Sequence, residues 1–174
     1  VDSGGYVYTL LNDEDGQVGV YASADIAAAM GMGGLGEGNT AENYGGLMVT
    51  AHGNQAAVAL GMGAVELGEG ASALHNHGSL TVTAEGPVGG TTEFAAALGM
   101  AGLGTGIEFE NAEGADLNLK AFGTVAAGAG IAALGTGNMV ENYGDVNVTA
   151  EGMGAAAALG LAALDLGDEK TTVH

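Results

Sequence analysis

Five short segments of the chain alternate between apolar and polar residues, and they recur at intervals of 29 to 37 residues. In each segment every second residue is Val, Leu or Ala, and a Thr, Tyr or Lys stands on the opposite face. A period of two with one apolar face predicts a half-buried β-strand. The five segments are GQVGVYA (16–22), GGLMVTA (45–51), GSLTVTA (78–84), ADLNLKA (115–121) and GDVNVTA (144–150).

A second, glycine- and alanine-rich phrase also occurs five times. Alanine favours helices, so a set of amphipathic helices is the alternative to strands. Each glycine in a helix interior costs about 1 kcal/mol relative to alanine, so repeated glycine opposes a helix. The copies differ in length by two residues, and in a strand such a difference leaves the following residues on the same face. We therefore expect strands. Their equivalent residues are Met32, Met62, Met100, Ile131 and Leu161.

A third phrase places an asparagine two or three residues before a glycine. Both residue types tolerate positive φ, so the phrase predicts a turn. In a stack of repeats, equivalent asparagine side chains can also hydrogen-bond to one another as a ladder. The four asparagines are Asn43, Asn76, Asn111 and Asn142.

A unit of about 30 residues with short strands and a glycine-marked turn predicts one rung of a parallel β-solenoid. The expected fold class is all-β, a single domain of about five rungs, open at both ends. A flattened stack of β-arches and a three-sided coil are both compatible with the spacing. The expected boundaries are a half rung at 1–22, rungs at about 23–53, 54–86, 87–122 and 123–152, and a half rung at 153–174.

The two ends of the predicted solenoid show no polar cap, although open strand edges recruit other chains. The chain is then either a segment of a longer array or a subunit whose ends join head to tail, a contact that does not close on itself. For the second case we expect the junction to involve Tyr6, Val7, Tyr8, Leu10, Thr171, Thr172 and Val173.

Composition and charge exclude several classes of protein. The 35 glycines do not fall on every third position, which excludes collagen, and the 47% hydrophobic content argues against disorder. The formal net charge of −19 argues against nucleic acid and anionic membranes as partners. Since no apolar run reaches about 18 residues, we expect no membrane insertion.

Candidate chemistry is sparse. Asp13, Glu14 and Asp15 form an oxygen-rich turn of the kind that binds calcium, with a solvated acidic turn as the alternative. His75 and His77, with His52, are candidate transition-metal ligands, but no third ligand has a fixed spacing, which favours exposed turn histidines. We expect no other cofactor. The chain contains no Arg, and no carboxylate cluster with a basic partner is evident, so we expect no enzyme.

The repeat style, Asn-x-Gly followed by an alternating VTA strand and Ala/Gly-rich strands, resembles the β-solenoid repeats of bacterial autotransporter and haemagglutinin-type passengers. It is also similar to the β-arch subunits of amyloid-like microbial fibres and sheaths. The resemblance covers about residues 16–167. It implies an exported, cell-surface protein and transfers no catalytic residue.

These observations predict a structural subunit of an extracellular fibre, sheath or surface layer that polymerises with itself by edge-to-edge strand stacking. Because the chain does not open on Met, we expect removal of a secretory leader. The alternative is an adhesin or passenger segment that binds a surface ligand, and a carbohydrate-active β-helix enzyme is a third hypothesis. Asn147 lies in an Asn-Val-Thr glycosylation sequon.

Overall fold

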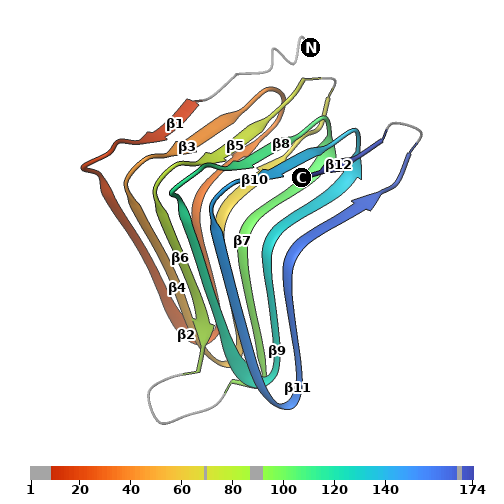
Figure 1. Ribbon diagram of the computed structural model, residues 1–174. Coiled ribbons are helices and arrows are strands. Elements are labelled where there is room, and N and C mark those ends of the chain that lie inside the picture. The colour runs from red at the N-terminus through yellow and green to blue at the C-terminus, as the bar shows by residue number, and fades with distance from the viewer. Residues whose placement is uncertain (1–8, 69, 87–91, 168–169) are drawn as a thin grey trace, which may run out of the picture.

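The computed structural model describes residues 9–68, 70–86, 92–167 and 170–174, and these residues form a parallel β-solenoid without a helix (Figure 1). The expected fold class is confirmed, and the helical alternative for the Ala/Gly-rich phrases is wrong. The strands are β1 (Thr9–Asn12), β2 (Gln17–Leu35), β3 (Thr40–Asn43), β4 (Gly46–Val65), β5 (Ala73–Asn76), β6 (Ser79–Glu85), β7 (Phe94–Thr105), β8 (Glu108–Asn111), β9 (Asp116–Thr136), β10 (Met139–Asn142), β11 (Asp145–Asp165) and β12 (Thr172–Val173).

Each rung consists of one short strand followed by one long strand. The short strands pair in the order β1-β3-β5-β8-β10-β12, and the long strands in the order β2-β4-β6-β9-β11. In the third rung, β6 and β7 together take the place of a long strand, and β7 also pairs with β4 and β9. All pairings are parallel, as expected where the chain winds in one direction around an axis.

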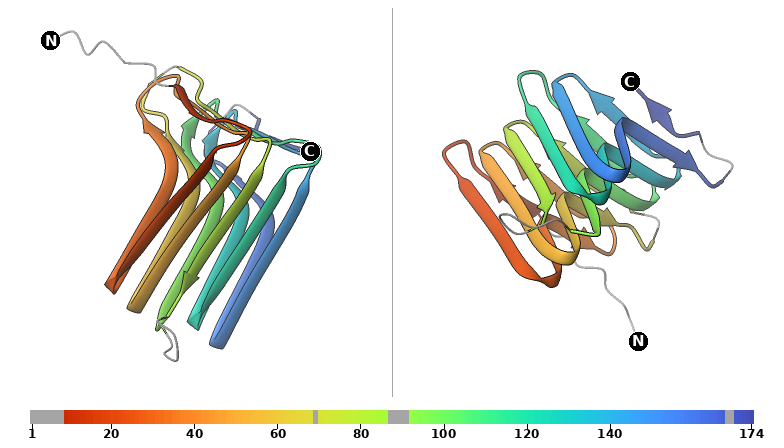
Figure 2. Two further views of the ribbon diagram at one scale, coloured as in Figure 1. Left: turned by 90° about the vertical axis from the view of Figure 1, so that its left-hand side faces the viewer. Right: turned by 90° about the horizontal axis from the view of Figure 1, so that it is seen from below.

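Each long strand folds back on itself at the narrow end of the solenoid, so its two halves face each other (Figures 1 and 2). We call the first halves, residues 17–24, 46–53, 79–85, 116–123 and 145–152, the first wall. We call the second halves, residues 26–35, 56–65, 94–105, 125–136 and 155–165, the second wall. The cross-section is therefore a β-arch at the narrow end, and the short strands form a third side at the wide end.

The register follows the sequence repeats. On the first wall Val20 pairs with Val49, Val49 with Val82, Val82 with Leu119 and Leu119 with Val148. On the second wall the aligned residues Met32, Met62, Met100, Ile131 and Leu161 pair in the same way. Stacking like residues on like residues lets every rung present the same inward face to its neighbours.

The core lies between the walls and beneath the short strands, and it is built mainly of Ala, Val, Leu and Met. Phe109 of β8 is the largest fully buried side chain. A Cβ atom on Gly102 would lie 2.6 Å from Cζ of Phe109, so a glycine at this position makes room for the ring.

The second wall turns away from the first wall along its course (Figure 1), and a column of stacked glycines runs across the middle of it. A Cβ atom on Gly61 would lie 2.6 Å from the carbonyl oxygen of Gly99 and 2.7 Å from Cδ1 of Leu80. Such distances exclude any side chain, so the close approach of backbone to backbone requires glycine. The column consists of Gly31, Gly61, Gly99, Gly130 and Gly160.

Candidate functional site: the two open ends of the solenoid

Five asparagines form a hydrogen-bonded ladder at the corner between the short strands and the first wall. Asn43 Nδ2 donates to Asn76 Oδ1 at 2.8 Å, and Asn76 Nδ2 donates to Asn111 Oδ1 at 2.8 Å. Asn111 Nδ2 donates to Asn142 Oδ1 at 2.8 Å, and Asn12 Nδ2 donates to Asn43 Oδ1 at 2.7 Å. Asn12 was missed by the sequence analysis because its glycine, Gly16, follows four residues later.

The ladder has a direction, because every Nδ2 donates toward the C-terminal end of the stack. At that end, Nδ2 of Asn142 donates to the carbonyl oxygen of Gly144 at 3.2 Å. At the other end stands the acceptor oxygen of Asn12. One end of the solenoid therefore presents an amide donor and the other an amide acceptor at equivalent positions.

The inward-facing residues of the short strands form one stacked row, the inward stripe, and its members at the two ends are exposed. Leu10 pairs with Ala41 at one end and is 38% exposed, and Val173 pairs with Val140 at the other end and is 45% exposed. The residues between them are at most 2% exposed: Ala41, Leu74, Phe109 and Val140. Leu10 and Val173 are thus core residues of a stack that the described chain does not continue.

The C-terminal face exposes core residues over its whole length. Val148 and Leu161 of β11 are partly exposed, whereas their partners Leu119 and Ile131 in β9 are buried. A Cβ atom on Gly160 would meet nothing within 4 Å, unlike one on Gly61. The fifth rung therefore has the inward residues of an interior rung, but no rung of the described residues lies above its walls.

The expected junction residues lie at these ends, with one difference from the expected half rungs. Tyr6, Val7 and Tyr8 lie outside the described residues. Thr172 and Val173 form β12, which pairs with β10, while Leu10 belongs to β1, which pairs with β3. The N-terminal and C-terminal half rungs thus each contain a short strand, β1 and β12. Placed end to end, the two half rungs would both supply the short-strand side, so they do not combine into one complete rung.

Asp165 fixes the corner that leads into β12, and the sequence analysis did not identify it. Its carboxylate accepts hydrogen bonds from the backbone N–H groups of Gly167 at 3.0 Å and Thr171 at 2.8 Å. These bonds favour the charged form and lower the pKa of Asp165 from its ordinary value. Thr171, an expected junction residue, thereby positions β12 through its backbone.

Glu66 is a second carboxylate that the sequence analysis missed. It is buried, and it accepts hydrogen bonds from Ser72 Oγ at 2.6 Å and from the backbone N–H groups of Gly38 and Gly68 at 3.0 and 3.3 Å. These donors tie the corner after the second wall in the second rung to the corner in the first. Its role is therefore structural.

The outer faces of the two walls differ. The first wall carries polar side chains, among which His52 Nε2 lies 3.3 Å from Glu85 Oε1 and Asn147 donates to Asn118 at 3.1 Å. The outer face of the second wall is apolar on all five rungs as far as the paired residues Leu35, Val65, Leu103, Leu134 and Leu164, and the register places Ala28, Val58, Ala96, Ala127 and Ala157 in one row across it. At the bend it forms a groove of about 630 Å³ lined by Gly, Ala, Val, Leu and Met.

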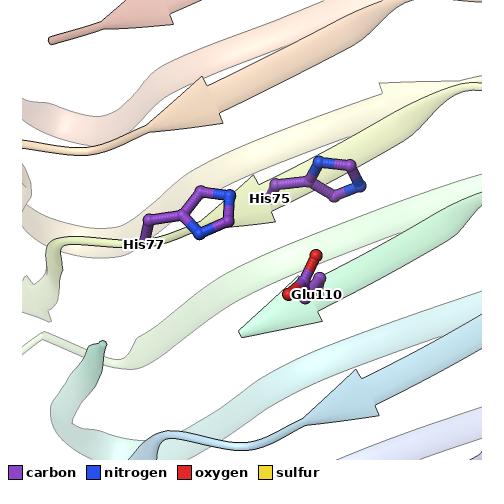
Figure 3. A group of neighbouring side chains, drawn as sticks. All are labelled: His75, His77 and Glu110. Carbon is purple, nitrogen blue, oxygen red and sulfur yellow. The ribbon is translucent and has the colours of Figure 1, made fainter. Parts of the chain in front are cut away.

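The acidic turn at Asp13, Glu14 and Asp15 is exposed. The N–H of Gly16 donates to the carbonyl oxygen of Asp13 at 2.7 Å, and the N–H of Glu14 donates to Asp13 Oδ1 at 2.9 Å. Calcium binding at this turn stays a prediction. In the described part of the chain, the ligand atoms that converge within 4.8 Å of one another belong to His75, His77 and Glu110 (Figure 3).

No family model, curated protein or solved structure matches the chain. Among the described residues, no helix has the length and hydropathy needed to cross a membrane. The β-solenoid itself is established by the strand pairing, whereas the likeness to surface-protein repeats rests on the repeat pattern alone.

Proposed function

We propose that this chain is a structural subunit that polymerises with itself, end to end, into an extracellular fibre, sheath or surface layer. The observation that carries the proposal is the termination of the core at both ends with apolar residues that are exposed or partly exposed, Leu10 of β1 at one end and Val148 and Leu161 of β11 at the other. Burying a leucine side chain contributes about 1.5–3 kcal/mol. A second copy stacked on either end would supply the missing neighbours.

The ends support a head-to-tail joint. A parallel stack continues only if the C-terminal face of one copy meets the N-terminal face of the next. In that arrangement Asn142 Nδ2 would donate to Asn12 Oδ1 of the next copy and extend the ladder by one bond. Such a contact joins two different surfaces and does not close on itself, so it produces a linear or curved polymer.

The joint requires one short strand to move. If β2 of the next copy pairs with β11, then β1 of that copy falls on β10, where β12 already lies. The β1 strand pairs through four residues, Thr9 to Asn12, whereas β12 pairs through Thr172 and Val173. We therefore expect β12 to leave and β1 of the incoming copy to replace it.

The surface charge opposes assembly and makes it depend on salt. Copies with a formal net charge of −19 repel one another, and this repulsion is screened as ionic strength rises. The apolar outer face of the second wall carries no such charge, so it is the surface by which neighbouring polymers in a sheath or layer would pack. The extracellular location is part of the proposal and is supported by the likeness of the repeats to surface proteins.

The proposal is tested by comparing Leu10→Asp with Leu11→Asp. Both variants add one negative charge to β1, but Leu10 belongs to the inward stripe, whereas Leu11 pairs with Glu42 on the outward face. We expect electron microscopy of the parent chain to show polymers with an axial repeat of about 4.8 Å. Leu10→Asp should raise the concentration needed for polymerisation by about 10-fold or more, and Leu11→Asp should change it little.

A chain that stays monomeric at all concentrations and salt conditions would overturn the proposal and favour the adhesin or passenger alternative. Equal effects of the two substitutions would show that charge, and not continuation of the core stripe, controls association. Circular dichroism of each variant at low concentration verifies that the isolated chain keeps its fold.

A further inference from the structure

Three potential metal ligands project outward from the short-strand face of the solenoid (Figure 3). His75 lies in β5 between the buried residues Leu74 and Asn76, and His77 follows two residues later on the same face. Glu110 lies in β8, where it pairs directly with His75. One nitrogen from each histidine and one carboxylate oxygen lie within 4.8 Å of one another.

The third ligand comes from the next rung. Within one repeat, the sequence shows the two histidines but no third ligand at a fixed spacing, because Glu110 follows His75 after a whole repeat. The pairing of Asn76 with Asn111 fixes this register, since it places the residues before them, His75 and Glu110, side by side. Stacking of rungs therefore completes a group that neither rung holds alone.

Contacts in the folded chain hold the two imidazoles. The ring of His77 stacks on the ring of Tyr44, with centroids 4.5 Å apart and an interplanar angle of 7°. The ring of His75 lies edge-on to that of His77, at 6.1 Å and 82°. Side chains that are already oriented lose less conformational entropy when they bind a cation.

One nitrogen of this group makes no hydrogen bond. Nε2 of His75 is shielded from solvent and makes no hydrogen bond. The nearby Oε1 of Glu108 is 3.7 Å away, which is beyond hydrogen-bonding distance. A cation bound by the His75 imidazole would therefore not have to break a hydrogen bond of Nε2.

The surroundings attract cations. Glu42 and Glu110 flank His75 on its two neighbouring rungs, and Glu141 continues the same outward row one rung beyond Glu110. Like charges at this spacing repel one another.

We propose that His75, His77 and Glu110 form a binding site for a divalent transition-metal cation such as Zn²⁺. Two imidazoles and one carboxylate are a ligand set that zinc uses, with a fourth position left to water. Tetrahedral ligation brings ligand atoms to about 3.4 Å from one another, so the side chains close in by small rotations. Imidazole ligands favour Zn²⁺, Cu²⁺ or Ni²⁺ over Ca²⁺ and Mg²⁺, which prefer oxygen.

The site is tested by titrating the untagged, metal-free chain with Zn²⁺ by isothermal calorimetry, in the presence of excess Mg²⁺ to occupy diffuse acidic sites. We expect one tight site per chain. The substitutions His75→Ala, His77→Ala and Glu110→Gln should each weaken it by about 10-fold or more. His52→Ala is the matched control, because His52 lies beside Glu85 on the first wall, and it should leave the affinity unchanged.

A second measurement does not depend on substitutions. In the parent chain, the imidazole ¹⁵N resonances of His75 and His77 should shift together at one equivalent of Zn²⁺, while those of His52 and His174 should not. The proposal is overturned if all four histidines respond alike, if the His75→Ala chain binds Zn²⁺ as the parent does, or if Ca²⁺ displaces Zn²⁺ at equal concentration.

Discussion

The fourth and fifth rungs have nearly the same inward residues but different surroundings. Leu119 and Ile131 of β9 are buried between neighbouring rungs, whereas Val148 and Leu161 of β11 pair with them on one side and face solvent on the other. The glycine column shows the same contrast. The backbone of Gly160 blocks a side chain at Gly130, while the space around a Cβ atom on Gly160 is open.

This contrast separates what the isolated chain needs from what a stack needs. In the fourth rung, the apolar residues and the glycine are explained by the rung above. In the fifth rung, the described chain supplies no wall above β11, yet the same residue types recur. The fifth rung is thus suited to being covered, and under the proposed function the cover is the first rung of another copy.

The largest effect is expected from a side chain in the glycine column of an interior rung. Gly61→Val places a branched side chain against the carbonyl oxygen of Gly99 and against Leu80. Both neighbours lie in packed rungs and have little room to move, so the substitution should destabilise the fold by about 3 kcal/mol. Urea denaturation followed by circular dichroism measures the loss, and an unchanged midpoint would show that the bend is not a close contact.

A somewhat smaller loss is expected from the middle of the asparagine ladder. Asn76→Ala removes the acceptor of Asn43 and the donor to Asn111. Both partners are buried, so the substitution should cost about 2–3 kcal/mol. Asn147→Ala is the control: its bond to Asn118 is exposed, and its loss should change the free energy of unfolding by less than about 0.5 kcal/mol. Similar losses in both variants would contradict the ladder's role.

The smallest effect is local and depends on pH. The pKa of Asp165 is lowered in the folded chain, first by the N–H of Gly167 and then by that of Thr171. A lowered pKa in the folded state means that this contribution is present above the ordinary carboxylate pKa of about 4 and is lost as the pH falls below it. The amide resonance of Thr171 should therefore shift on acidification below about pH 4, and it should not do so in Asp165→Asn.

The sequence predicted the repeats well because a stack imposes the same residue types at the same place in every rung. The alignment of Met32 with Met62 and of Val20 with Val49 is the register of the structure. Asn12 was not predicted as a member of the ladder because its turn to Gly16 is longer than the other turns. Where a residue's neighbour is a whole rung away, as for Glu110 beside His75, spacing within one repeat carries no signal.

The two faces of the second wall were also indistinguishable from the sequence. Alanine and glycine fill both its inward and its outward positions, so no alternation of apolar and polar residues shows which positions face the core. That β1 and β12 are equivalent short strands could not be predicted from the sequence either. It depends on the place of Thr172 and Val173 over β10, and their segment lacks the asparagine that marks the other short strands.

The measurement that tests head-to-tail assembly most directly compares Gly160→Val with Gly19→Val. A Cβ atom at either position meets nothing within 4 Å in the isolated chain, so both variants should fold with unchanged stability. In a polymer, the side chain at residue 160 would meet the backbone of Gly31 in the next copy, as Gly130 meets Gly160 within the chain. Residue 19 pairs with Met48, on the outward face of the first wall.

We expect Gly160→Val to abolish polymers in sedimentation and electron microscopy while its monomer unfolds at the midpoint of the parent chain. Gly19→Val should polymerise as the parent does. Polymers of normal abundance and axial repeat from Gly160→Val would contradict the account, because the C-terminal face would then not be covered by another rung.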